Sequence, residues 1–196
     1  MLLDLQNVTL FGLDTINYTG LLKAASITQQ HIVFGNVVLL SEKDVRVSSG
    51  EDYSRFILTG LPGLINTDFV LIIQSDGYVL NPLAWDSDFM SYDYIGAPWD
   101  DMKVGNGGFS LRSYKFIKTA SDLFINDSNP KFHPEDNYSC RLQYNKMIES
   151  GITFAPPSVA KNFSMEANPT YGYKWNGQFG FHNDRITDIS DYENFT

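Results

Sequence analysis

The sequence predicts an α/β fold with a largely parallel central sheet. Apolar segments of strand length alternate with segments whose apolar residues recur at helical spacing. The segment 68–74 (DFVLIIQ) is short and continuously apolar, which is typical of a central strand covered on both faces. The order strand–helix–strand–helix–strand favours helices packed against a sheet whose strands mostly run in one direction.

The first half of the chain supplies five alternating elements. Apolar spacing predicts strands over 7–14, 32–40 and 68–74, and helices over 18–30 and 51–65. Gly60 and Pro62 weaken the end of the second helix, because both residues disfavour a helix interior.

The second half is less regular. We expect short strands over 92–97, 109–112 and 152–155, and helices over 113–124 and 134–150. Ser113 is the expected cap of the first of these helices, and Pro134 the first residue of the second. Residues 160–196 are rich in Asn, Gly and Tyr and predict a loop or tail that closes over a single domain spanning 1–196.

Composition excludes several classes of protein. With 43% hydrophobic and 19% charged residues, the 196-residue chain has enough apolar material for a core and is not expected to be disordered. Its net charge of −9 argues against a nucleic-acid partner, since phosphates would be repelled. Apolar runs of about seven residues are too short for a membrane span. One cysteine and a start without a basic segment favour a cytoplasmic location.

The first motif with possible chemistry is 74–77 (QSDG), directly after the buried strand. In parallel α/β sheets, ligands bind outside the carboxyl ends of the strands. Asp76 is therefore placed to hold a divalent cation. Ser-Asp-Gly is equally ordinary turn chemistry, so both interpretations stay open for this motif alone.

The second motif is the glycine cluster within 104–112 (VGNGGFSLR). Gly105, Gly107 and Gly108 would let the backbone approach a ligand closely. The spacing matches neither a P-loop nor a dinucleotide fingerprint. A hairpin or bulge is the alternative.

Two further motifs carry titratable side chains. In 132–137 (FHPEDN), Glu135 and Asp136 open an expected helix, where one carboxylate could accept a proton from a hydroxyl. Favourable charge at a helix start is the alternative. Near the end, His182 stands in 178–182 (QFGFH), where a neutral imidazole could ligate a metal, although a lone histidine usually does not.

The order of the four motifs resembles the nucleotide-sugar-dependent glycosyltransferases of the GT-A fold. Those enzymes carry an acidic metal motif after a central strand, a glycine-rich loop, an acidic motif opening a helix, and a late histidine. The stretches LIIQSDGYVLNP, YDYIGAPW, VGNGGFSLRS, HPEDNYSCRL, ITFAP and FGFH look especially like a little-characterised subfamily of such domains. The resemblance runs from about Phe56 to His182, and a weaker one is to the domains that large algal viruses encode for decorating capsid glycans.

There is one departure from the family pattern. The metal motif is usually Asp-x-Asp, and Gln74 occupies its first position here. Asp76 with His182 can still hold a metal if the diphosphate and water supply the other ligands, so binding without nucleotide should be weak. The sequence DSD at 86–88 is a second acidic candidate, but we interpret it as a solvated helix face.

The resemblance implies a metal-dependent hexosyltransferase. Asp76 and His182 would bind Mn²⁺ or Mg²⁺, which neutralises the leaving diphosphate that this acidic chain has few cations to balance. Asp136 would be the base that takes the proton of a glycan or glycoprotein hydroxyl, with Glu135 orienting it or binding the acceptor. A base at this motif is usual in inverting members, which favours inversion.

The donor site follows from the same resemblance. The nucleotide, expected to be UDP, would lie against Asp14 and Thr15 after the first strand, with Ser75 and Asp76 of the metal motif close by. Gly107 and Gly108 would lie against the donor sugar and the acceptor. Glucose or a deoxyhexose such as rhamnose is the expected donor sugar. Two further residues are candidates for the donor site. Arg55 would reach the base or phosphate, its alternative being a surface charge, and Trp99 would stack on a sugar, its alternative being packing.

Three other functions remain open from the residues. A nucleotidyltransferase would want more basic residues than the 14 Lys and Arg present. A carbohydrate-binding module would explain the aromatic content of 14% but not the Glu135–Asp136 pair. A degenerate, non-catalytic transferase domain would explain Gln74. The end of the sequence carries no terminus signal, so a larger multidomain parent is a further expectation.

Overall fold

A computed structural model describes residues 2–99, 101, 103–166 and 175–183. The central sheet has five strands in the order β2-β1-β3-β5-β4. Its strands are β1 (Leu3–Leu13), β2 (Ile32–Leu40), β3 (Phe69–Ile73), β4 (Tyr94–Gly96) and β5 (Ser110–Ser113). β1 pairs in parallel with β2 and β3, while β5 runs antiparallel between β3 and β4. The predicted α/β fold with a mostly parallel sheet is confirmed.

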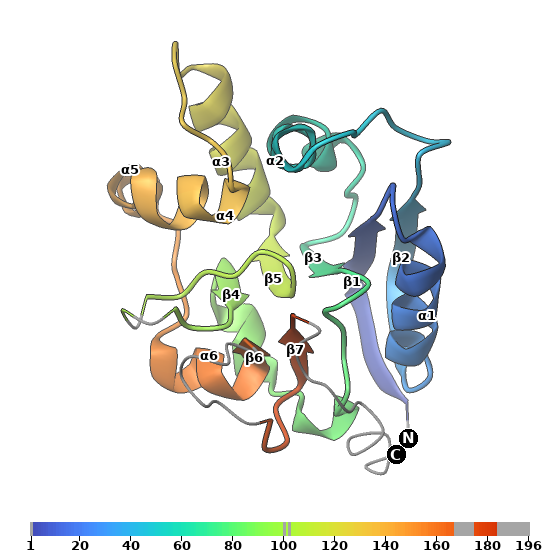
Figure 1. Ribbon diagram of the computed structural model, residues 1–196. Helices are drawn as coiled ribbons and strands as arrows, with labels where there is room; N and C mark the ends of the chain where they lie inside the picture. Colours follow the sequence, from blue (N-terminus) through green and yellow to red (C-terminus); the bar gives the residue numbers. More distant parts are fainter. Residues whose placement is uncertain (1, 100, 102, 167–174, 184–196) are drawn as a thin grey trace.

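The helices are placed by side-chain caps at their first turns. α1 (Tyr18–Gln29) begins where Asn17 accepts from the backbone N–H of Gly20, and it packs along β2 and β1 (Figure 1). α2 (Gly50–Thr59) is capped by Ser49, and the 3₁₀ turn Leu61–Gly63 follows it. α3 (Tyr114–Ile125) contacts α2, and Ser113 caps it, as the sequence predicts. Each cap satisfies a backbone donor that a helix leaves unpaired.

The core lies around the middle strands. All residues of β3 except Phe69 are buried, as are all residues of β4 and β5, so these short strands are covered on both faces. β2 behaves differently, because its side chains alternate between more and less exposed along the strand, as expected at a sheet edge. The buried centre explains the continuous apolar run of 68–74 in the sequence.

The region 134–150 does not form the one helix that was expected. It is divided into α4 (Glu135–Asn137), a π-helical turn (Tyr138–Leu142) and α5 (Tyr144–Glu149), and Pro134 is the cap residue, extended at ψ 153°, rather than the first helical residue. The expected strand over 152–155 is also wrong, since only a single bridge joins Phe154 to Tyr94. Short runs with mixed periodicity carry too little local signal to fix such breaks.

The expected C-terminal loop contains regular structure in its described part. α6 (Pro157–Phe163) leads into β6 (Ser164–Glu166), which pairs in parallel with β7 (Gly180–His182). The remaining parts of that expectation, 167–174 and 184–196, lie outside the described residues, and closure of the tail over a ligand stays a prediction. None of the helices in the described ranges has the length and apolar character that a membrane span requires.

One edge of the sheet collects the motif loops. The parallel strands β1 and β3 end there, at Leu13 and Ile73. Because β5 is antiparallel, its first residue, Ser110, pairs with Ile72 near the end of β3, and this brings the preceding glycine loop to the same edge. β4 ends there too, since Gly96 pairs with Ser110. The fold therefore brings three separate motifs together.

Candidate active site

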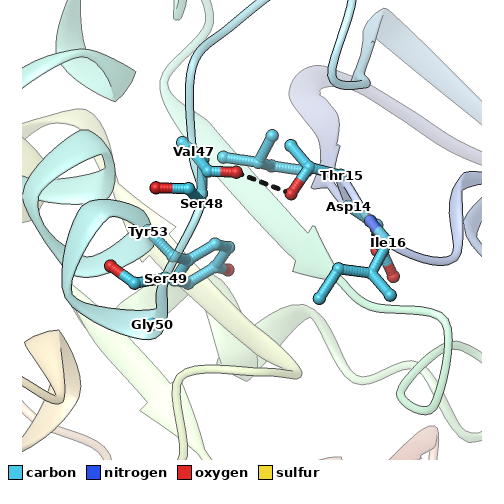
Figure 2. Close-up of a pocket in the computed structure, with 9 residues that line it drawn as sticks. Asp14, Thr15, Ile16, Val47, Ser48, Ser49, Gly50 and Tyr53 are labelled. Atoms are coloured by element: carbon cyan, nitrogen blue, oxygen red, sulfur yellow. Dashed lines mark hydrogen bonds between the residues drawn. The ribbon is translucent and has the colours of Figure 1, made fainter.

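A pocket of about 190 Å³ opens beside the end of β1. Figure 2 shows the loop after β1 facing the segment that leads into α2, with Thr15 donating its hydroxyl to the carbonyl of Val47 at 2.8 Å. The lining residues are Leu13, Asp14, Thr15, Ile16, Val47, Ser48, Ser49, Gly50 and Tyr53. The predicted nucleotide residues Asp14 and Thr15 thus line a pocket.

Asp14 connects this pocket to the metal motif. One carboxylate oxygen, Oδ1, accepts the backbone N–H groups of Ile16 and Asn17 at 2.9 and 2.6 Å, which fixes the turn into α1. The other, Oδ2, accepts the hydroxyl of Ser75 at 3.0 Å. Two residues that are 61 positions apart therefore hold the ends of β1 and β3 together.

His182 lies against the metal motif and not in an isolated tail. The backbone N–H of Asn183 donates to the carbonyl of Asp76 at 2.8 Å, which places β7 beside the turn after β3. His182 Nε2 is 3.9 Å from Asp76 Oδ1 and 3.0 Å from Gln74 Oε1. Its Nδ1 is 2.9 Å from Glu166 Oε2. The imidazole is thus enclosed by oxygen atoms.

Charge around His182 is strongly negative. Burial lowers the pKa of His182, but the hydrogen bond and charge of Glu166, together with the charges of Asp76 and Asp136, raise it overall. A site that favours a positive charge on its histidine is one that would also favour a bound cation.

The spacing of Asp76 and His182 can be compared with that of two ligands of one divalent cation. Ligands about 2.1 Å from an octahedral ion lie about 3.0 Å apart when adjacent and about 4.2 Å apart when opposite. The observed 3.9 Å matches neither value, so the two side chains would have to come about 0.9 Å closer to bind one ion as adjacent ligands. In the described part of the chain, no group of three or more His, Cys, Asp and Glu side chains could hold a metal. These residues therefore fit a cation only if other oxygen donors, such as a diphosphate and water, complete its coordination.

The glycine loop lies between His182 and the acidic motif, and its backbone is close to both. A Cβ on Gly108 would lie 2.1 Å from His182 Nε2, and one on Gly107 would lie 2.4 Å from Glu135 Oε1 and 3.2 Å from Asp136 Cβ. A methyl group at either position would displace these side chains, which favours glycine at both. The loop brings the predicted base and the predicted metal ligand to the same place.

Asp136 is held by the backbone. Its Oδ2 accepts the N–H of Gly107 at 2.9 Å, and its Oδ1 accepts the N–H of Asn137 at 2.7 Å. The side chain is half-buried. Each carboxylate oxygen has two lone pairs, so acceptor capacity remains for a substrate hydroxyl.

Glu135 faces the interior. It is 5% exposed and accepts from Arg112 at 2.9 Å, and Arg112 also donates to the carbonyl of Gly107 at 3.2 Å. Burial raises the pKa of Glu135, and the charge of Arg112 only partly offsets this. This arrangement favours the orienting role for Glu135 over acceptor binding, and both roles stay predictions.

Two predicted residues lie away from the Asp14 pocket. The guanidinium of Arg55 sits 4.6 Å from the ring centre of Phe132 and pairs with Glu51 at 3.8 Å, and Arg55 is not among the pocket residues. Trp99 lies nearer the glycine loop, where its Nε1 donates to Asn106 Oδ1 at 3.1 Å.

The ring of Trp99 is already in contact with the protein. The guanidinium of Arg141 lies 4.2 Å from its centre, and a Cβ on Gly105 would lie 2.1 Å from its atoms. A sugar could stack on the covered face only after Arg141 moved. Packing against the glycine loop is what Trp99 does in this structure.

Comparison with known proteins places the chain in a family. The family model described as "Protein of unknown function (DUF5672)" matches residues 37–182. The chain belongs to this family. Among curated proteins, no sequence matches this DUF5672 member significantly.

Two solved structures share the fold of this DUF5672 member. One is a glycosyltransferase involved in the glycosylation of the major capsid of PBCV-1, with 15% identity, coverage of 95% of this chain and 97% of that chain, and a TM-score of 0.54. The other is an active-site mutant of LgtC, with 14% identity, coverage of 96% and 93%, and a TM-score of 0.50. The expected GT-A-like fold is confirmed, while the subfamily within it stays a prediction.

Several residues of the site were missed by sequence reasoning. Arg112 is the buried partner of Glu135, Glu166 is the partner of His182, and Tyr53 accepts from Gln74 Nε2 at 3.1 Å. Arg112 follows the glycine loop in a strand that the sequence predicts to be short, and a charge there is a weak sign of a buried pair. Glu166 has no local signal, because its partner is 16 residues away.

Proposed function

We propose that this protein transfers a hexose from UDP-sugar to a hydroxyl of a glycan or glycoprotein acceptor. The observation that carries the proposal is the glycine loop, which contacts the predicted base through Gly107 and the predicted metal ligand through Gly108. A base and a cation on two sides of one glycine-rich segment suit a reaction in which a hydroxyl is deprotonated while a diphosphate leaves.

The residues divide the reaction between them. The oxygen of the acceptor hydroxyl bonds to C1 of the sugar, and Asp136 accepts the proton that this hydroxyl loses. The bond between C1 and the diphosphate oxygen breaks, and UDP leaves with the electron pair. Glu135 and Arg112 hold the start of α4 against Gly107, which keeps Asp136 in place. Inversion at C1 follows if this single displacement is the whole reaction.

Asp76 and His182 would hold Mn²⁺ or Mg²⁺ in this proposal. When bound, the cation supplies Lewis-acid stabilisation of the diphosphate that leaves. Oxygen ligands suit both ions, and the imidazole favours Mn²⁺. The chain's net charge of −9 supports a need for such a cation, since protein cations are few.

The Asp14 pocket is the proposed nucleotide site. Oδ2 of Asp14 and the hydroxyl oxygen of Thr15 each keep acceptor capacity for the ring N–H of uracil or for ribose hydroxyls. Tyr53 provides an aromatic side chain on the other wall of the pocket. Glucose and a deoxyhexose such as rhamnose are the proposed donor sugars.

Calorimetry with UDP, in the presence and absence of Mn²⁺, tests the proposal. We expect UDP to bind at least tenfold more tightly with Mn²⁺, and ADP and GDP to bind more weakly than UDP. A panel of UDP-sugars in the same assay identifies the hexose. Absence of UDP binding with Mn²⁺ would reject the proposed donor site, and tight UDP binding without any turnover of UDP-sugars would favour a degenerate domain instead.

A further inference from the structure

We propose that Glu166 is a positioning residue for His182, which it holds with Nε2 directed at the cation site beside Asp76. This inference rests on the proposed function, because it concerns the cation that Asp76 and His182 are proposed to bind. It adds a residue that neither the sequence motifs nor the metal motif contains.

The two side chains face each other because their strands pair directly. β6 and β7 are parallel, and Glu166 is the register partner of His182. Met165 and Phe181, the preceding pair, alternate to the other face and are 5% and 0% exposed. Burial of that apolar pair fixes the register, so Glu166 and His182 are held on the same face of the ladder.

The hydrogen bond between them determines the role of each ring nitrogen. A carboxylate only accepts, so Nδ1 of His182 carries the proton in its 2.9 Å contact with Glu166 Oε2. The other nitrogen, Nε2, is the one that lies 3.9 Å from Asp76 Oδ1. In this structure Nε2 donates to Gln74 Oε1 at 3.0 Å, because an amide oxygen only accepts. The Nε2 lone pair would be available to a cation once that proton is lost and the Gln74 amide turns away. A carboxylate behind a histidine ligand also makes the imidazole a stronger donor.

Glu166 also compensates for the missing carboxylate at position 74. Gln74 brings no charge, and its amide bridges Tyr53 and His182 through contacts of 3.1 and 3.0 Å. Glu166 supplies a second negative charge, next to that of Asp76, through a hydrogen bond to the ligand. Both side chains of the Glu166–His182 pair are only about one-fifth exposed, so solvent weakens this effect only partly.

The test compares Glu166→Ala and Glu166→Gln with the wild type. Glu149→Gln, on the exposed side of α5, is the matched control. Mn²⁺ affinity is measured by electron paramagnetic resonance of free Mn²⁺ at saturating UDP, and UDP affinity without metal by calorimetry. We expect Glu166→Ala to lower Mn²⁺ affinity by about 10- to 100-fold and to leave metal-free UDP affinity unchanged within about twofold. Glu166→Gln keeps an acceptor oxygen and should lose less.

The possible outcomes distinguish the role of Glu166 from the proposed metal site itself. Mn²⁺ affinities within twofold of the wild type for both variants would overturn this inference alone. An equal loss of metal-free UDP affinity would also overturn it, because Glu166 would then serve only to hold the two strands together. A wild-type protein that binds UDP but no Mn²⁺ would reject the proposed metal role and this inference with it.

A measurement on the wild type avoids any folding defect of the variants. The chain has three histidines, so ¹⁵N-labelled imidazole spectra can be assigned with His182→Asn as the reference. With Mg²⁺ and UDP bound, the spectrum of His182 should show a protonated Nδ1 and an unprotonated Nε2. A proton on Nε2 in that state would overturn the inference.

Discussion

Arg112 and Glu135 form an ion pair that is almost completely buried, with 2.9 Å between Nη2 and Oε1 and side chains 2% and 7% exposed. The same guanidinium donates to the carbonyl of Gly107, whose N–H is bonded to Asp136. The pair therefore connects β5, the glycine loop and the start of α4. Through Gly107 it helps to fix the position of Asp136, the proposed base.

Glu135→Gln should destabilise the protein strongly. The change leaves the Arg112 charge buried with no opposite charge, and removing one partner of a buried pair typically costs about 3–5 kcal/mol. Urea unfolding of the variant measures the free energy of unfolding. The double variant Arg112→Met/Glu135→Leu should recover most of the loss, since neither charge is then buried.

The exposed pair of Lys118 and Asp122 on α3 provides the control. Because solvent surrounds both of its side chains, Asp122→Asn should change the free energy of unfolding by no more than about 0.5 kcal/mol. If Glu135→Gln is as mild as this control, the buried pair does not support the acidic motif.

Ser75→Ala should weaken nucleotide binding without affecting folding greatly. The substitution removes the hydrogen bond that fixes one oxygen of Asp14. Since such a bond contributes about 0.5–1.5 kcal/mol, the UDP dissociation constant should rise by about 2- to 10-fold. Calorimetry measures this change, with Ser150→Ala on the exposed end of α5 as the control. An unchanged UDP affinity would contradict the assignment of this pocket to the nucleotide.

Gly108→Ala should reduce Mn²⁺ affinity at least tenfold in the presence of UDP. The added methyl group would lie 2.1 Å from His182 Nε2, so the imidazole has to leave its position beside Asp76 Oδ1 and Gln74 Oε1. Gly63→Ala is the matched control, because a Cβ at Gly63 meets no atom within 4 Å. Equal Mn²⁺ affinities for the two variants would show that Mn²⁺ binding does not depend on the position of His182 in this structure.

Arg55→Ala should leave UDP affinity within about twofold of the wild type. The guanidinium lies over Phe132 and beside Glu51, and it does not line the Asp14 pocket. Loss of this cation–π contact should cost about 0.5–1 kcal/mol of stability. A tenfold loss of UDP affinity would mean that Arg55 reaches the nucleotide, as the sequence resemblance suggested.

The sequence predicts the first half of the fold well because periodicity there is strong. The strand over 32–40 matches β2 in both bounds. In the second half, Ser113 caps α3 as expected. In the region 134–150, tertiary contacts take precedence over periodicity. Glu135 turns inward to Arg112, and the chain continues as a π-helical turn before α5 begins.

The site itself is only partly visible in the sequence. Order along the chain is enough to suggest Asp76, the glycine loop, Asp136 and His182, and the structure brings these four together. Glu166 could not be found in this way, because a three-residue strand paired with a distant one leaves no local pattern. The outward position of Arg55 likewise depends on aromatic residues more than 60 positions away.

The most direct test of the proposed reaction is turnover of a UDP-sugar by the wild type and by Asp136→Asn. Asparagine keeps the size of the side chain and an acceptor oxygen for Gly107, but it cannot take a proton. We expect kcat to fall by about 10²- to 10⁴-fold while the dissociation constant of UDP with Mn²⁺ stays within about twofold. Wild-type turnover retained by Asp136→Asn would contradict the proposed role of Asp136.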